Sequence, residues 1–556
     1  MGIPHYFHTI TKSYDNVILY TKPSIDIDHF FIDFNGIVHT AANKVDEKTN
    51  DLIYAKTWEL TVESVKIIKP VKMIHICADG VAPVAKMNQQ RKRRYLSVFR
   101  ESLTSVKACE SLTSVKACES LSLTSVKACE SLSLTSVKAC ESLTSVIPWD
   151  RNCISPGTKF SKELNIYIRN CIRENDTKYL YSFNSSDDPG EGEHKIFARI
   201  ANLSDTDTCV VHGLDADLIM LALISHKKNI YLMRENDRSY NEFDKFIYLN
   251  IHELRLSILK ELQSTYIWDI TAEMLSDPYS DPSKDIIESY IVLCFLLGND
   301  FLPHIPSLSL KNKGHERILS IAKKISINIV DHKTGKIDIE AILNILIELN
   351  KDENKIMTIL NQEYIAKQPY QGCDRIESYP IQKEHKSKLA NLLIEKNNKW
   401  RAFYYKELFD SELHDTSIII NACNCFIKGI FWTYAYYKRR PELMIDVQYY
   451  YPYEYSPTIL DLSNYLQSSL ETWKDIEVLN KNAIDKLFVH PNVQLLCILP
   501  SISLPDHLKK YAEDSKYGLK HMFPIKYKIH TYLKTQLWEC SPVLPLLDIE
   551  HVEETI

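Results

Sequence analysis

The stretches HFFIDFNGIVH (29–39) and MIHICADG (73–80) decide the fold. Each is an apolar run of strand length that leads into an acidic residue, Asp33 or Asp79, with a glycine within the next three residues. Residues 62–72 between them read as a helix broken by a proline. Such an alternation of strand and helix favours an α/β sheet, and ligands gather at the carboxyl ends of its strands.

The same alternation returns after residue 147. CVVHGLDADLIMLAL (209–223) reads as a strand leading into a helix, NIYLMRE (229–235) as a further strand, and ESYIVLCFLLGNDFLPH (288–304) as a buried helix ending near Asn299. After about residue 325 the pattern is mostly helical. We therefore predict an α/β core with a twisted, mostly parallel sheet flanked by helices over 1–100 and 147–325, and a mostly helical second region over 326–556.

Residues 101–146 are a tandem repeat. ESLTSVKAC occurs twice, ESLSLTSVKAC follows twice, and ESLTSV closes the run. Nine residues leave a helix about half a turn out of phase, whereas eleven nearly restore it, so one apolar stripe cannot persist through the repeat. We predict an exposed insertion without a functional role, because biased segments rarely build a core.

Composition excludes some classes of protein. The chain has 556 residues, 45% of them hydrophobic, and a net charge of −6, so a nucleic-acid partner would need a local basic patch. The N-terminus has no apolar signal segment, and apolar runs such as that near Cys294 are too short to cross a bilayer. The 14 cysteines show no zinc spacing, which indicates reduced thiols in the cytoplasm or nucleus. Nothing in the sequence indicates a membrane or a protein partner.

Seven acidic residues lie in five short segments that otherwise read as buried. Two of these segments carry acids two residues apart, and in extended backbone alternate residues point to one face. Unpaired buried carboxylates are costly, and oxygen ligands suit Mg²⁺ or Mn²⁺, so the acids predict a metal site for phosphoryl chemistry. The seven are Asp33, Asp79, Glu191, Glu193, Asp215, Asp217 and Asp300.

Each acid taken alone also has a structural interpretation. Asp217 could cap the helix that follows it, and Asp300 could be a turn residue. Five such segments together are harder to explain in this way.

A basic helix follows Asp79 in the stretch AKMNQQRKRRYL (85–96). Its spacing places Lys86, Gln90, Arg93 and Arg94 along one side, where they could hold a terminal phosphate through charge-assisted hydrogen bonds. A solvated cationic face or a nuclear-import tract is the structural alternative.

Together these motifs resemble the eukaryotic 5′→3′ exoribonuclease family, the Xrn nucleases. In the first half the resemblance is carried, in order, by MGIPHYF, FIDFNGIVH, ADGVAPVAKMNQQRKRR, NCISPGTKF, PGEGEHKI, GLDADLIML and CFLLGNDFLPHIPSL. In the second half it is carried by RAFYYKELF, YYYPYEYSPTILDL, LLCILPSISLP and LWECSPVLPLLD. The resemblance implies a PIN/FEN-like nuclease core that degrades single-stranded RNA with a 5′-monophosphate, using two Mg²⁺ ions (or Mn²⁺) and releasing 5′-mononucleotides.

The resemblance also assigns roles to individual residues. It implies that the seven acids are the metal site, and that Lys86, Gln90, Arg93 and Arg94 form the 5′-phosphate pocket. His39 matches a histidine that stacks on a base, and Tyr449 stands where the family has a tryptophan that stacks with it. Val84 stands where the family has arginine, and the repeat falls where the family has a helix projecting from the core.

Two other functions remain open from the sequence. A flap-type, structure-specific DNA nuclease shares the logic of the acid cluster, although the basic pocket and the second region argue against it. A catalytically inactive RNA-binding scaffold would be expected to lose metal ligands, because uncompensated carboxylates repel one another. None is lost here.

Overall fold

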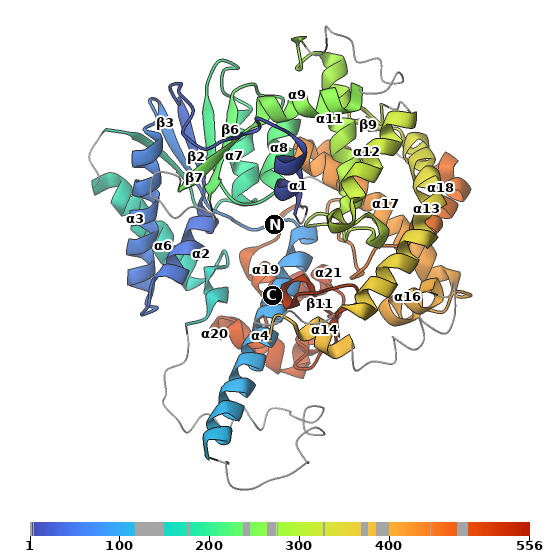
Figure 1. Ribbon diagram of the computed structural model, residues 1–556. Helices are drawn as coiled ribbons and strands as arrows, with labels where there is room; N and C mark the ends of the chain where they lie inside the picture. The colour runs from blue at the N-terminus through green and yellow to red at the C-terminus, as the bar shows by residue number, and fades with distance from the viewer. Residues whose placement is uncertain are drawn as a thin grey trace.

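A seven-stranded sheet forms the centre of the computed structural model (Figure 1). The structure describes residues 3, 5–116, 149–174, 178–236, 245–263, 274, 276–325, 328–367, 376–384, 400–444, 446–474 and 487–556. The strand order is β1 (Ile18–Leu19), β7 (Phe246–Asn250), β6 (Ile230–Glu235), β5 (Cys209–His212), β2 (His29–Asp33), β3 (Met73–Cys77) and β4 (Leu180–Asn184). The strands from β6 to β4 are parallel and β7 is antiparallel to both neighbours, so the predicted mostly parallel sheet is confirmed.

Helices cover both faces of the sheet because its central strands are apolar on both sides. Alternate residues of β2 point in opposite directions. Phe30 and Ile32 pack in the core that includes α2 (Phe34–Lys44), α3 (Asn50–Ile68) and α6 (Lys159–Glu174). Phe31 belongs to the opposite core, with α7 (Gly192–Ile200), α8 (Asp217–Ile224), α9 (Ile251–Gln263) and α11 (Asp281–Cys294). Figure 1 shows these two groups of helices on either side of the strands.

The described part of the second half is mainly helical, as predicted. Two short antiparallel pairs, which the sequence did not indicate, interrupt the helices: β8 (Val330–Asp331) with β9 (Lys336–Ile337), and β10 (Ile529–His530) with β11 (Ser541–Pro542). The boundary near residue 325 stays a prediction. The other helices are α1 (Tyr6–Ser13), α12 (Gly314–Ile325), α13 (Ile339–Ala366), α14 (Tyr379–Glu384), α16 (Trp400–Phe409), α17 (Thr416–Lys438), α18 (Ile459–Lys474), α19 (Pro491–Ile498), α20 (Asp506–Glu513) and α21 (Ile549–Thr555).

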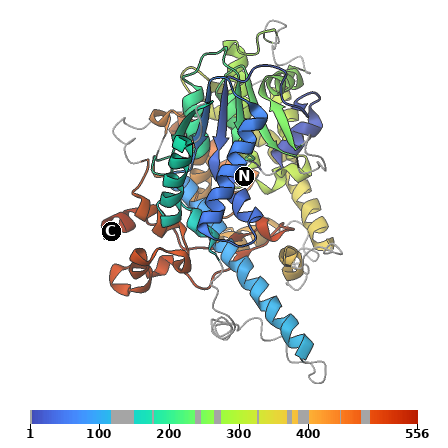
Figure 2. The ribbon, with the colours of Figure 1, turned by 90° about the vertical axis from the view of Figure 1, so that its left-hand side faces the viewer.

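Helix α4 (Val84–Lys116) is the longest described helix and projects from the body in both ribbon views (Figures 1 and 2). Its first turn is anchored: Val84, where the family has arginine, is fully buried in an apolar cluster shared with α19. The far end carries the start of the repeat, where Glu101, Ser102 and Thr104 are exposed. Residues 117–148 lie outside the described residues, so the role of the insertion stays a prediction.

Helix α17 is long and apolar enough to cross a membrane, the one such helix among the described residues. Its most apolar window is 61% buried inside the fold, as expected for a core helix. The buried helix predicted to end near Asn299 is the last part of α11, which ends at Cys294. A short 3₁₀ turn, Phe295–Leu297, continues the apolar run.

Candidate metal and nucleic-acid site

Three of the acids lie together at the carboxyl ends of three neighbouring strands. Strands β5, β2 and β3 are parallel neighbours, Asp33 is the last residue of β2, and Asp79 and Asp215 follow the ends of β3 and β5. The backbone N–H of Gly192 donates to Asp79 Oδ1 at 2.7 Å. A Cβ on Gly192 would lie 3.1 Å from Asp33 Oδ1 and 3.3 Å from Asp79 Oδ1, so both carboxylates converge on the start of α7.

A second group of acids surrounds Lys86. Its Nζ lies 2.5 Å from Glu191 Oε2, 2.7 Å from Asp300 Oδ2 and 3.9 Å from Glu193 Oε1. All four side chains are buried. One ammonium group therefore neutralises only part of the negative charge that the fold collects here.

The pKa directions join the two groups into one cluster. Burial, followed by Asp79 and Asp215, raises the pKa of Asp33 well above its usual value. Burial and the charge of Asp300 raise the pKa of Asp217 to about 7. Burial also raises the pKa of Glu193 well above its usual value, and Asp217, Glu191 and Asp215 act in the same direction against Lys86.

The cluster has the character of a site for hard divalent cations. The donors are carboxylate oxygens, which suit Mg²⁺ and Mn²⁺. Glu193 Oε2 is buried and has no hydrogen-bond partner among the described residues. Buried polar atoms of this kind need an explanation, and a bound cation would supply the missing contact.

One local prediction is wrong. The acid pairs do not lie on extended backbone, because helices begin inside both motifs. Glu191 is extended, but Gly192 opens α7 and places Glu193 in its first turn; Ala216 is helical and Asp217 opens α8 as its first residue, not as its cap. The acids reach the site from two helix N-termini, where the helix dipole favours negative charge.

The loops that carry Asp79 and Glu191 are joined through glycines. Gly80 N–H donates to Gly190 O at 2.9 Å, and Gly190 N–H donates to Val81 O at 2.7 Å. A Cβ on Gly80 would lie 1.8 Å from Asp188 O, which is a clash with backbone. Only glycine permits this approach, so Gly80 fixes the separation of two acid-bearing segments.

Gly80→Ala should therefore destabilise the protein by about 1–3 kcal/mol, because the two loops must move apart. Thermal or urea unfolding measures the change. Gly36→Ala is the matched control: a Cβ there meets nothing within 4 Å, and alanine favours the helix α2. Equal effects of the two substitutions would contradict this account.

The basic side chains of α4 lie beside the acids. Arg93 Nη2 is 3.5 Å from Asp300 Oδ2, and Arg93 Nε is buried without a partner among the described residues. Arg94 donates to Ser155 Oγ at 2.8 and 3.2 Å and to Gln90 O at 3.1 Å. Of the four residues predicted to bind the 5′-phosphate, Lys86 makes the closest ion pairs with the acids. It therefore links the predicted phosphate pocket to the predicted metal site.

Among the described residues, no ring contact joins His39 and Tyr449, the two residues predicted to stack on bases. The side chain of His39 is solvent-accessible, but the protein atoms crowded around its ring lower its pKa to about 4, and Arg151, Arg94 and Arg93 add to the effect. It is therefore neutral at physiological pH. Tyr449 is only 4% exposed, donates to Cys425 O at 2.9 Å and packs against Trp432, with ring centroids 5.9 Å apart. Base stacking by either ring stays a prediction.

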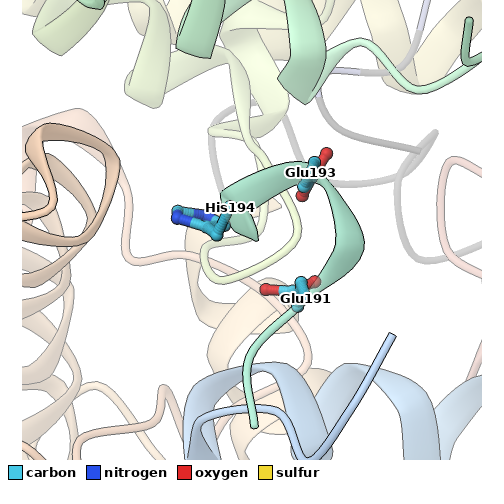
Figure 3. A group of neighbouring side chains, drawn as sticks. All are labelled: Glu191, Glu193 and His194. Atoms are coloured by element: carbon cyan, nitrogen blue, oxygen red, sulfur yellow. The ribbon is translucent and has the colours of Figure 1, made fainter. Parts of the chain in front are cut away.

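Several residues at the site were not identified from the sequence. Tyr436 and Tyr437 of α17 donate to Glu191 Oε1 at 2.8 Å and to Asp217 Oδ1 at 2.7 Å. His194 lies close enough to Glu191 and Glu193 to share an ion, but Figure 3 shows its ring directed away from Glu193. The centroid of that ring is 3.8 Å from that of Tyr436, which favours a packing role. The position of His194 inside PGEGEHK was the only available sequence signal.

Mg²⁺ should raise the melting temperature of the metal-free protein more at pH 8 than at pH 6. The folded pKa of Asp217 is about 7, and Asp33 and Glu193 shift in the same direction. A carboxyl whose folded pKa lies above its unfolded pKa stabilises the fold while protonated and loses that contribution as pH rises through the folded pKa. Metal binding needs the ionised form, so the cation restores more stability at pH 8.

Differential scanning fluorimetry at the two pH values, with a monovalent salt of equal ionic strength as control, measures this effect. If Mg²⁺ raised the melting temperature more at pH 6 than at pH 8, the proposal that the clustered acids bind the cation would be contradicted.

Comparisons with known proteins agree with this geometry. Residues 1–236 match the family described as XRN 5'-3' exonuclease N-terminus, and residues 282–392 and 366–556 match the Xrn1 helical domain. Human 5'-3' exoribonuclease 1 is 24% identical over all of this chain and 34% of its own length. The Drosophila melanogaster 5'-3' exoribonuclease 2 homolog is 24% identical over 99% of this chain and 70% of its own.

A Saccharomyces cerevisiae relative, 5'-3' exoribonuclease 1, is 31% identical over 56% of this chain and 20% of its own length. This chain thus spans about a third of the length of the human relative. The two family matches nevertheless cover most of the sequence, in the order that the motifs predicted. The chain belongs to the Xrn family of 5'-3' exonucleases.

Proposed function

We propose that this protein is a 5′→3′ exoribonuclease that hydrolyses single-stranded RNA from a 5′-monophosphate end and releases 5′-mononucleotides. One observation carries the proposal: seven carboxylates from five separate segments form one cluster, and cationic side chains of α4 lie beside it. The relatives described above are named 5'-3' exoribonucleases, which agrees with this activity.

The acid cluster is the proposed holder of two Mg²⁺ ions, with Mn²⁺ as a substitute. When bound, such ions activate a water molecule and stabilise the leaving 3′-oxygen of the scissile phosphodiester. The residues proposed to hold them are Asp33, Asp79, Glu191, Glu193, Asp215, Asp217 and Asp300. Tyr436 and Tyr437 orient two of these carboxylates through their hydroxyl hydrogen bonds.

The 5′-monophosphate is proposed to bind Lys86, Gln90, Arg93 and Arg94. Ser155 and the backbone of Gln90 hold the Arg94 guanidinium in place, which lowers the entropy lost on binding an anion. Arg93 Nε has no partner among the described residues and is available to a phosphate oxygen. A cap or triphosphate would need space and cationic partners beyond these four side chains.

His39 is proposed to stack on a base near the scissile bond, which is sequence-tolerant because every base has a π-face. Its neutral state suits stacking more than phosphate binding. Selection of RNA over DNA would depend on contacts with 2′-hydroxyl groups. Nine of the cysteines in the described part of the chain form no disulfide, and a cytoplasmic or nuclear location is part of the proposal.

Matched RNAs with 5′-monophosphate, 5′-triphosphate and 5′-hydroxyl ends test the proposal. With Mg²⁺ we expect mononucleotides to be released stepwise from the monophosphate RNA and much more slowly from the other two. Equal rates on all three would remove the phosphate pocket. Faster cleavage of a labelled DNA flap would favour the flap-type nuclease, and RNA binding without Mg²⁺-dependent hydrolysis would favour the inactive scaffold.

A further inference from the structure

A chamber lies between α4 and the C-terminal segment, beside the acid cluster. It has a volume of about 240 Å³, and its lining includes Gln89, Asn299, Asp300, Lys534 and Trp538. A second cavity of about 240 Å³ shares Gln89, Asn299, Asp300 and Trp538 and runs along α4 past Lys92. Helix α4 and strand β11 lie side by side here (Figure 1). Asp300 and Trp538 line both cavities, and Arg93 of the proposed 5′-phosphate pocket lines the second.

The chamber contains a cation without a direct counter-charge. Among the described residues, Lys534 Nζ forms no ion pair, and it lies 5.6 Å from the centroid of the Tyr455 ring. The neighbouring Lys311 is paired with Glu539 and is therefore neutralised. Burial lowers the pKa of Lys534, against the opposing charge of the nearby Glu539. An anionic ligand would compensate this charge.

The rest of the lining suits a nucleobase. Phe301 N–H and Leu302 N–H donate to Asn299 Oδ1 at 2.9 and 2.8 Å, which leaves Asn299 Nδ2 buried and without a partner among the described residues. Gln89 Oε1 is also buried and unpartnered in that part of the chain. Trp538 lines both cavities and is 50% exposed, so its ring offers a stacking surface.

We propose that this chamber binds the nucleoside 5′-monophosphate product on its way from the acid cluster to the surface. Lys534 binds the phosphate and Trp538 stacks on the base. The amides of Gln89 and Asn299 form hydrogen bonds with the polar edge of the base. The inference rests on the proposed exonuclease function, because that reaction supplies a mononucleotide beside Asp300. It adds an anion site at Lys534, in a cavity that Arg94 does not line.

Titration calorimetry with AMP in Mg²⁺ buffer tests the chamber. Because AMP can also occupy the 5′-phosphate pocket, the parent protein carries Arg94→Met. Adding Lys534→Met should weaken AMP binding by about tenfold or more, as expected for loss of a hydrogen bond to a charged group. Lys526→Met, an exposed lysine eight residues earlier, is the matched control and should leave AMP binding unchanged. Equal AMP affinity in the parent and in the Lys534→Met variant overturns the proposal.

Trp538→Leu separates nucleotide recognition from general anion binding. It should weaken binding of AMP and adenosine but not of inorganic phosphate, and equal AMP affinity in this variant would also overturn the proposal. Circular dichroism checks folding, and Lys534→Gln replaces Lys534→Met if the latter is unfolded. An intact 5′-end preference without a Lys534 effect removes only the chamber, whereas a Lys534 effect without a 5′-end preference removes only the phosphate pocket.

Discussion

Asp79→Asn should lower the rate of RNA hydrolysis by about a thousandfold or more while RNA binding survives, because it removes charge where a catalytic cation would bind. The substitution changes little else. Asparagine has nearly the same shape, and its side-chain oxygen can still accept the 2.7 Å hydrogen bond from Gly192 N–H. A large loss of activity would therefore report the missing carboxylate.

Single-turnover hydrolysis of a 5′-monophosphate RNA at saturating Mg²⁺ measures the effect, and fluorescence anisotropy measures binding. Asp506→Asn is the control, because that side chain is 95% exposed on α20. If Asp79→Asn kept most of the hydrolytic activity, Asp79 would be removed from the proposed metal site. The same experiment at Asp215 and Asp217 would then show whether the remaining acids act together.

Much of the site could be predicted because its acids follow strands of a parallel sheet. The apolar runs before Asp33, Asp79 and Asp215 become β2, β3 and β5, and parallel neighbours bring their carboxyl ends together. The helical run 85–96 was equally clear, since it has helix formers and no breaker. These features depend on local sequence and on one rule of topology, that ligands bind at the carboxyl ends of parallel strands.

Other parts of the site depend on contacts between distant segments. Tyr436 and Tyr437 reach Glu191 and Asp217 across more than two hundred residues, and no periodicity marks them. Spacing likewise could not show that Lys86 would point into the acids, because a helix face defines a direction but not what lies opposite it. The extended geometry expected for the acid pairs failed because Gly192 and Ala216 already belong to helix starts.

Tyr449 illustrates a related limit. Alignment of YYYPYEY with the family placed it at a stacking position, but the fold buries its ring against Trp432 and ties its hydroxyl to Cys425. A motif fixes the place of a residue in the chain, whereas rotamer and packing decide whether it can meet a ligand.

Arg94→Met should reduce the preference for 5′-monophosphate over 5′-hydroxyl RNA by about tenfold to a hundredfold, the range expected when a charge-assisted hydrogen bond to phosphate is lost. Methionine keeps the length and apolar stem of the side chain, so packing along α4 changes little. The ratio of kcat/KM for the two RNAs is the measurement, because a general loss of folding or of metal binding would lower both values together. Arg100→Met provides the matched control on the same helix, since Arg100 is exposed and pairs with Glu377 at 2.6 Å, away from the acids. If both variants kept the parental ratio, the terminal phosphate would have to be recognised elsewhere, and the rigid hold of Ser155 on Arg94 would serve stability alone.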